Sequence, residues 1–406
     1  MQLNPKTSNH NFYAFLWHAG FLAFAQNFMD VDTVIPAMII EAGGGAIHIG
    51  IMTAIMLGGS SFTQIFFASP LSNIPYKKNY LLLGINIRVF SLFALGLILF
   101  FLQTDQSFLL LYLIFLFITL FSLSGAFTNI SYTDILGKSI QPEKRKTFFS
   151  VKQVIAGVIF LISAFLAKRV LTFWEYPLNY AMMFLLGASV LFVASGGFWK
   201  IKETIPSSLK IKGYKDFRNI LKKEIHNNPK LVYFLGFINT QGIMLSFLPF
   251  VMLYAKTTLQ TESNDTGIFL IYKVSGVVSV SLLVFFMVKK IKYNFLLYTN
   301  LVLSILLIIG ALFIQDDYLI RFLFILGGII FSLYSITMNG LLLEVSGSAN
   351  RAIYTGFAGA GNILPALFPI AGGWIINQFG FITFFITFLV IVSSSLFFIY
   401  KIDCRK

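Results

Sequence analysis

Four ionisable side chains lie inside stretches of this sequence that are otherwise almost uncharged: Asp30, Asp32, Arg88 and Lys273. A charge inside a segment long enough to cross a membrane destabilises the protein by several kcal/mol unless the charge faces a partner or water. These residues are therefore candidates for a polar pathway through an apolar protein. The alternative is that some of them only form structural pairs or lie near the membrane surface.

The composition of the chain predicts that it lies in a membrane. Of its 406 residues, 57% are hydrophobic and only 11% are charged, and the mean hydropathy is +0.82. Soluble domains carry roughly 25% charged residues, whereas a membrane-spanning helix needs about 20 mostly apolar residues. We therefore predict an all-α integral membrane protein with about twelve transmembrane helices. The predicted spans are 13–40, 46–70, 79–102, 107–136, 147–171, 179–199, 230–255, 265–288, 294–314, 319–345, 352–377 and 381–400.

The basic residues are distributed in a way that predicts the orientation. If both termini are cytoplasmic, most of the 30 Lys and Arg residues fall in cytoplasmic segments, as the positive-inside rule requires. This distribution explains the net charge of +14 without a nucleic-acid partner. We expect a multi-pass protein of the cytoplasmic (inner) membrane whose first span is retained, because a signal peptide pattern is absent. Cys404 is the only cysteine, which excludes an internal disulfide and a cysteine metal cluster.

The two halves of the sequence repeat each other weakly. A polar linker at 201–229 separates an N-terminal bundle of six spans (1–200) from a C-terminal bundle of six spans (230–406). Several residues recur at corresponding places in the two halves, which indicates duplicated bundles with the substrate site between them. The matched pairs are Pro36 with Pro249, Gln26 with Asn239, Asn86 with Asn300, Lys78 with Lys292, Asn129 with Asn339, Asp134 with Glu344, and Arg145 with Arg351.

These features resemble the major facilitator superfamily over nearly the whole chain. The signature loop of that family after span 2 corresponds to residues 69–78, where Leu71 and two lysines match and Asn73 replaces an aspartate. The acidic-to-arginine loops after spans 4 and 10 also resemble the family. The resemblance implies that these charges control a cytoplasmic gate, although simple anchoring at the membrane interface is the alternative. The predicted gating residues are Asn73, Lys77, Lys78, Asp134, Arg145, Glu344 and Arg351.

In this family spans 1, 4, 7 and 10 line the central cavity, so the resemblance implies a polar lining there. Asp30 lies on one helical face with Gln26 and Asn27, because positions three and four apart are neighbours. Arg88 lies in a supporting span, and Asp30 is its nearest acidic neighbour by depth. The predicted substrate and proton pathway comprises Gln26, Asn27, Asp30, Asp32, Arg88, Asn129, Tyr132, Asn239, Gln241, Lys273, Tyr334 and Asn339.

The function predicted from these residues is secondary active transport of a small solute by alternating access. We favour proton coupling in a symporter, because a carboxylate in a low-dielectric cavity can bind and release a proton. An uncoupled facilitator, a drug-efflux antiporter and a non-transporting receptor remain alternatives. A membrane-embedded enzyme is disfavoured, because the sequence has no His-Glu-x-x-His, Gly-x-Ser-x-Gly or Walker A pattern. We expect a monomer in the lipid bilayer that binds a small molecule and a coupling proton and needs no cofactor.

Overall fold

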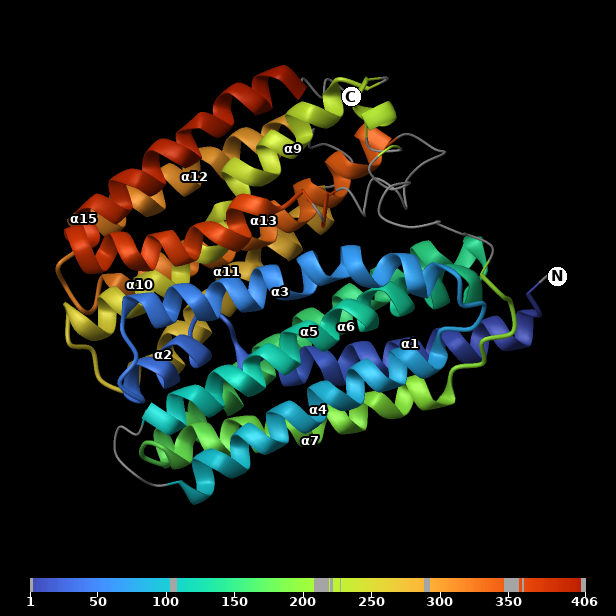
Figure 1. The fold of residues 1–406 in the computed structure, drawn as a ribbon, viewed down its shortest axis with the longest axis horizontal. Helices are drawn as coiled ribbons and strands as arrows, with labels where there is room; N and C mark the ends of the chain where they lie inside the picture. Colours follow the sequence, from blue (N-terminus) through green and yellow to red (C-terminus); the bar gives the residue numbers. More distant parts are fainter. Residues whose placement is uncertain are drawn as a thin grey trace. The chain divides into compact units, whose positions relative to one another are not determined.

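The structure is a computed structural model, and it describes residues 3–102, 108–207, 219, 222–226, 228–287, 293–346, 358–359 and 361–402. All regular elements in these ranges are helices (Figure 1). They are α1 (Pro5–Gln26), η1 (Asn27–Met29), α2 (Val34–Glu41), α3 (Ala46–Ser72), α4 (Lys78–Phe101), α5 (Phe108–Ser139), α6 (Pro142–Phe173), α7 (Leu178–Lys200), α9 (Lys230–Gln241), η2 (Gly242–Ser246), α10 (Phe247–Thr257), α11 (Asp265–Met287), α12 (Tyr293–Phe313), α13 (Ile320–Ser346) and α15 (Ile363–Ile402).

The predicted transmembrane helices are confirmed as an all-helical fold. Within the described residues, nine helical stretches are long and apolar enough to cross a membrane. The first predicted span is divided between α1 and α2, and the second is α3. Span 12 and the part of span 11 from Ile363 onward lie within α15, which bends at Gly380. The backbone there has φ 81° and ψ 175°, a conformation that is accessible essentially only to glycine.

Spans 1 and 7 are each interrupted close to the proline that the repeat analysis matched. A proline inside a helix has no amide hydrogen to donate to the carbonyl group four residues earlier. Because Pro36 cannot donate to the carbonyl of Asp32, α2 does not extend as a regular helix toward η1, and irregular backbone at residues 30–33 separates the two. Likewise, Pro249 cannot donate to the carbonyl of Leu245, which lies in the 3-10 helix η2. The corresponding breaks place polar residues at the ends of short helices in both spans.

Packing divides the chain into two compact units. The first unit comprises Met1–Asp30 and Phe62–Phe217, and the second comprises Val31–Ser61 and Arg218–Lys406. In the first unit, α4 packs on both α5 and α7, and α1 packs on α6 and α7 (Figure 1). The predicted division into bundles at 1–200 and 230–406 stays a prediction, because this packing groups the segment Val31–Ser61 with the C-terminal helices.

In the second unit, the segment Val31–Ser61 contacts helices that come more than 200 residues later. Helix α2 packs on α10 and α11, and α3 approaches α15 at two glycines. A Cβ atom added at Gly50 would lie 2.3 Å from the backbone oxygen of Pro369. One added at Gly373 would lie 2.4 Å from the backbone oxygen of Ala46. These two positions therefore require glycine if α3 and α15 are to lie at this distance.

Candidate functional site

The polar residues predicted in span 1 have different surroundings. Gln26 is exposed at the end of α1, whereas Asn27 is buried and donates two hydrogen bonds from Nδ2 to α6. Its acceptors are the backbone oxygen of Phe160 and Oγ of Ser163, each at 2.7 Å. Asp30 is half-buried and follows η1 with an extended backbone. Asn27 therefore fixes the broken end of span 1 against α6 within the first unit.

Arg88 and Tyr132 both contact aromatic side chains of the first unit. The Nε atom of Arg88 donates to the backbone oxygen of Phe121 at 3.3 Å, and its guanidinium carbon lies 4.7 Å from the centre of the Phe121 ring. Tyr132 packs edge-on against Phe15 at 5.3 Å between ring centroids, and the ammonium of Lys152 lies 5.9 Å from its ring. Asn129, on the same helix, is exposed. The predicted pairing of Arg88 with a carboxylate stays a prediction.

Two predicted residues of span 7 join helices of the second unit. Asn239 donates from Nδ2 to the backbone oxygen of Gly361 at 2.7 Å, and its Oδ1 accepts from the amides of Ile363 and Leu364 at the start of α15. Gln241 is fully buried and bonds through both amide atoms, to Ser304 of α12 and Ser395 of α15. Both side chains have their hydrogen-bonding groups engaged by the protein, so they position α15 and α12 relative to α9.

A buried ion pair joins Asp32 to Lys273 inside the second unit. The Nζ atom of Lys273 lies 2.5 Å from Oδ2 of Asp32, and both residues are only 7% exposed. The backbone of Lys273 is fixed against α13, since a Cβ atom added at Gly328 would lie 2.0 Å from the Lys273 carbonyl oxygen. A second pair joins Lys256 to Glu41 at 3.5 Å. Each pair connects the segment Val31–Ser61 to a C-terminal helix.

Asp32 also lines a small cavity in the second unit, which we call the Asp32 cavity. Its volume of about 10 Å³ is close to the minimum that admits one water molecule. Only two of its lining side chains are polar, the carboxylate of Asp32 and the phenol of Tyr334. The remaining walls come from Met244, Leu245, Leu248, Leu307, Gly327, Ile330 and Phe331.

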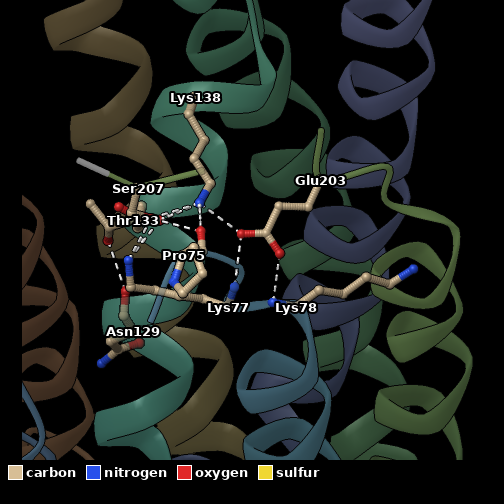
Figure 2. Close-up of polar contacts among 9 residues, drawn as sticks. Pro75, Lys77, Lys78, Asn129, Thr133, Lys138, Glu203 and Ser207 are labelled. Atoms are coloured by element: carbon tan, nitrogen blue, oxygen red, sulfur yellow. Dashed lines mark hydrogen bonds and ion pairs between the residues drawn. The ribbon is translucent and has the colours of Figure 1, made fainter. Parts of the chain in front are cut away.

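A second group of charges lies in the first unit, where α4 begins and α5 ends. The carboxylate of Glu203 accepts from the backbone amides of Lys77 and Lys78, each at 2.8 Å, and pairs with the ammonium of Lys138 at 2.7 Å (Figure 2). Glu203 therefore caps the positive end of the α4 dipole, where an acidic group is stabilising. We call this group the Glu203 cluster, and its members are Lys77, Lys78, Asp134, Lys138, Glu203 and Ser207.

Asp134 and Ser207 complete the Glu203 cluster. The carboxylate of Asp134 pairs with Lys77 at 3.0 Å and with Lys138 at 2.8 Å. The hydroxyl of Ser207 donates to Asp134 at 2.6 Å and accepts from both lysines, at 2.6 Å and 2.7 Å. Figure 2 shows these side chains converging from the loop before α4, from α5 and from the segment after α7. The cluster thereby joins the first part of the predicted linker to the first unit.

The other predicted gating residues are not brought into this cluster. Asn73 is exposed, and Arg145 donates from its guanidinium to the backbone oxygens of Gly137 and Ile140 near the end of α5. A basic group at a helix C-terminus is favourable because it meets the negative end of the dipole. Arg351 and the side chains of Asn339 and Glu344 lie outside the described residues, so their predicted roles stay predictions.

Sequence reasoning missed three members of the Glu203 cluster and the second ion pair of the second unit. Lys138 follows Asp134 by four residues on a helix, a spacing that predicts a pair and was available in the sequence. Glu203, Ser207 and the Glu41–Lys256 pair had no comparable signal, since their partners lie more than 60 residues away. The close approach of α3 and α15 at Gly50 and Gly373 was equally invisible in the sequence.

Comparison with known proteins now decides the family. The model of the Major Facilitator Superfamily matches residues 16–362. The chain belongs to the major facilitator superfamily. No curated protein matches the sequence. The loop that resembles the signature of this superfamily contributes Lys77 and Lys78 to the Glu203 cluster.

Three solved structures with a similar fold are distant in sequence. A variant of the nucleoside transporter NupG superposes with a TM-score of 0.69 at 14% identity, covering 97% of this chain and 99% of that one. A bacterial homologue of the human lysosomal transporter Spinster gives a TM-score of 0.66 at 13% identity, covering 98% and 97%. A POT family transporter in complex with a thioalcohol-conjugated peptide gives a TM-score of 0.66 at 14% identity, covering 98% of this chain and 97% of that one. At these identities the likeness shows the fold. The family identifies a multi-pass membrane transporter and not an enzyme.

Proposed function

We propose that this chain is a secondary active transporter that moves a small solute by alternating access and couples the movement to protons. The observation that carries the proposal is the buried pair between Asp32 and Lys273. Asp32 belongs to the N-terminal sequence half and Lys273 to the C-terminal half, so a motion that separates the halves at this level must break the pair. A contact present in only one of two states biases the equilibrium between them.

The orientation is part of the proposal. The positive-inside distribution supports cytoplasmic termini. In that orientation Asp32, Glu41 and the facing ends of α10 and α11 would lie toward the outer surface of the cytoplasmic membrane. The segment Val31–Ser61 then forms the outer closure, held by two ion pairs and by the glycine contacts of α3 with α15. The predicted cytoplasmic gating set, with Asp134 and Glu344 as the acids, controls the opposite side.

Asp30 is the proposed coupling residue. It is half-buried at the end of η1 and follows the polar residues Gln26 and Asn27 in span 1. The rest of the proposed pathway comprises Asp32, Arg88, Asn129, Tyr132, Asn239, Gln241, Lys273, Tyr334 and Asn339. The contacts of Asn27, Asn239 and Gln241 with neighbouring helices support a positioning role for these three.

Transport in proteoliposomes tests the proposal. Ligands are first selected by thermal-shift screening of purified protein against metabolites and drugs. Counterflow of a labelled ligand should occur, and an inwardly directed proton gradient should drive its accumulation. Asp30→Asn should abolish accumulation and preserve exchange. Counterflow without any response to the gradient would establish an uncoupled facilitator, and accumulation driven by an outward gradient would establish an antiporter. Binding without counterflow would refute transport.

A further inference from the structure

The Asp32 cavity has the chemistry of a site for an ammonium group. It offers one carboxylate, one phenol and the aromatic side chain of Phe331, and its other walls are apolar. A carboxylate beside an aromatic face attracts a cation through both its charge and the ring quadrupole. An anion would meet the carboxylate without a compensating charge among the lining residues. The cavity itself has room for about one water molecule, so an ammonium group with an apolar body can reach Asp32 only by taking the place of a side chain beside the cavity.

Lys273 supplies such a group from within the protein. Its ammonium lies 2.5 Å from the Asp32 carboxylate and 5.8 Å from the centre of the Phe331 ring, within the range of a cation–π contact. Lys273 is not part of the cavity wall, so its ammonium reaches Asp32 from beside the cavity. The backbone of Lys273 packs closely against Gly328, so a change of side-chain rotamer vacates this place without disturbing the contact between α11 and α13.

We propose that Asp32 is an entry subsite for solutes that carry a primary ammonium group on an apolar body, and that Lys273 occupies this subsite when solute is absent. The inference rests on the proposed transport function and names the solute class for that site. Solute binding at Asp32 displaces the Lys273 ammonium, which then needs water. Water becomes available when the segment Val31–Ser61 moves away from α10 and α11. Return of Lys273 to Asp32 releases the solute and restores the closed arrangement.

Chemical complementation of Lys273→Ala tests the subsite directly. This substitution removes Cγ, Cδ, Cε and Nζ, and n-propylammonium contains the same number of carbon and nitrogen atoms. The variant should lose thermal stability in detergent, because it leaves the Asp32 carboxylate buried without this ammonium. Added n-propylammonium chloride should restore stability in a saturable manner, as expected for a ligand that binds the folded state.

Matched controls separate specific binding from general salt effects. The thermal stability of Lys273→Ala should not be restored by sodium chloride at equal ionic strength, by n-propanol or by sodium propionate. The double variant Asp32→Asn with Lys273→Ala should not respond to n-propylammonium. An equal response of the double variant, or no response of Lys273→Ala, would overturn the subsite.

A measurement with Lys273 intact covers the case in which Lys273→Ala does not fold. Spin labels at Ile47→Cys and Thr258→Cys, in a Cys404→Ser background, report the distance between α3 and the end of α10. Alkylammonium ions should increase the population of long distances, and Asp32→Asn should remove that response. Unchanged distances in the presence of these ions would overturn the displacement of Lys273.

The outcomes also separate this inference from the transport proposal. Counterflow of a screened solute together with a failed complementation leaves transport standing and refutes the ammonium subsite. Complementation without counterflow of any bound solute establishes the subsite and refutes transport.

Discussion

Replacing Glu203 should destabilise the first unit more than replacing any exposed acid at a helix start. The Glu203 side chain is 3% exposed, accepts two amide hydrogen bonds at the start of α4, and pairs with Lys138. Removing one partner of a buried pair costs about 3–5 kcal/mol. Lys138 keeps its second carboxylate, Asp134, so we expect about 3 kcal/mol for Glu203→Ala, the lower end of that range.

The conservative variant refines this expectation. Glu203→Gln keeps one carbonyl acceptor but directs an amide group toward a second backbone donor. Leaving one buried donor unsatisfied costs about 1–3 kcal/mol, so Glu203→Gln should be less damaging than Glu203→Ala. The matched control is Glu143→Ala, which changes an exposed acid in the first turn of α6 and should have the smallest effect.

The assay is equilibrium unfolding in mixed micelles followed by tryptophan fluorescence, for the parent and the three variants. Each variant is measured at low and high sodium chloride, because salt screens exposed charges strongly and buried pairs much less. The Glu203 effect should persist at high salt. Two results would show that the Glu203 cluster is a solvated surface feature. One is a loss of unfolding free energy for Glu203→Ala that is no larger than for Glu143→Ala, and the other is a loss that disappears at high salt.

Three further predictions concern helix contact, the half-buried Arg88 and the inner gate. Gly50→Ala should lower the free energy of unfolding by about 1–3 kcal/mol, because its Cβ would collide with a backbone oxygen of α15. The control Gly157→Ala should not lower the free energy of unfolding, because a Cβ atom there meets nothing within 4 Å. Equal effects of the two substitutions in unfolding titrations would contradict the close contact of α3 with α15. Arg88→Ala should reduce both thermal stability and transport, and a normal melting temperature would argue against a structural role for its contacts with Phe121. Asp134→Asn with Glu344→Gln should shift the protein toward the inward-open state, and unchanged spin-label distances across the cytoplasmic face would identify both acids as interface anchors.

Most of the fold could be predicted from the sequence, because the membrane imposes a local rule. Each span must bury its backbone polar groups in a helix of about 20 apolar residues, and hydropathy alone reveals such segments. The breaks in spans 1 and 7 also have a local cause, the missing donor of Pro36 and Pro249. The acid-to-lysine spacing of Asp134 and Lys138 follows from helix geometry in the same way.

The charged residues of the pathway could be identified from the sequence, but their partners could not. Asp32 and Lys273 were candidates because each lies in an apolar run, yet they are 241 positions apart in the sequence, and nothing in the sequence signals their contact at 2.5 Å. The same holds for Glu203 at the start of α4 and for Gly50 against α15. Hydropathy and helical periodicity report the surroundings of a residue within one helix. Pairing of charges and the approach of glycines depend on how helices pack on each other, and only the tertiary structure decides that packing.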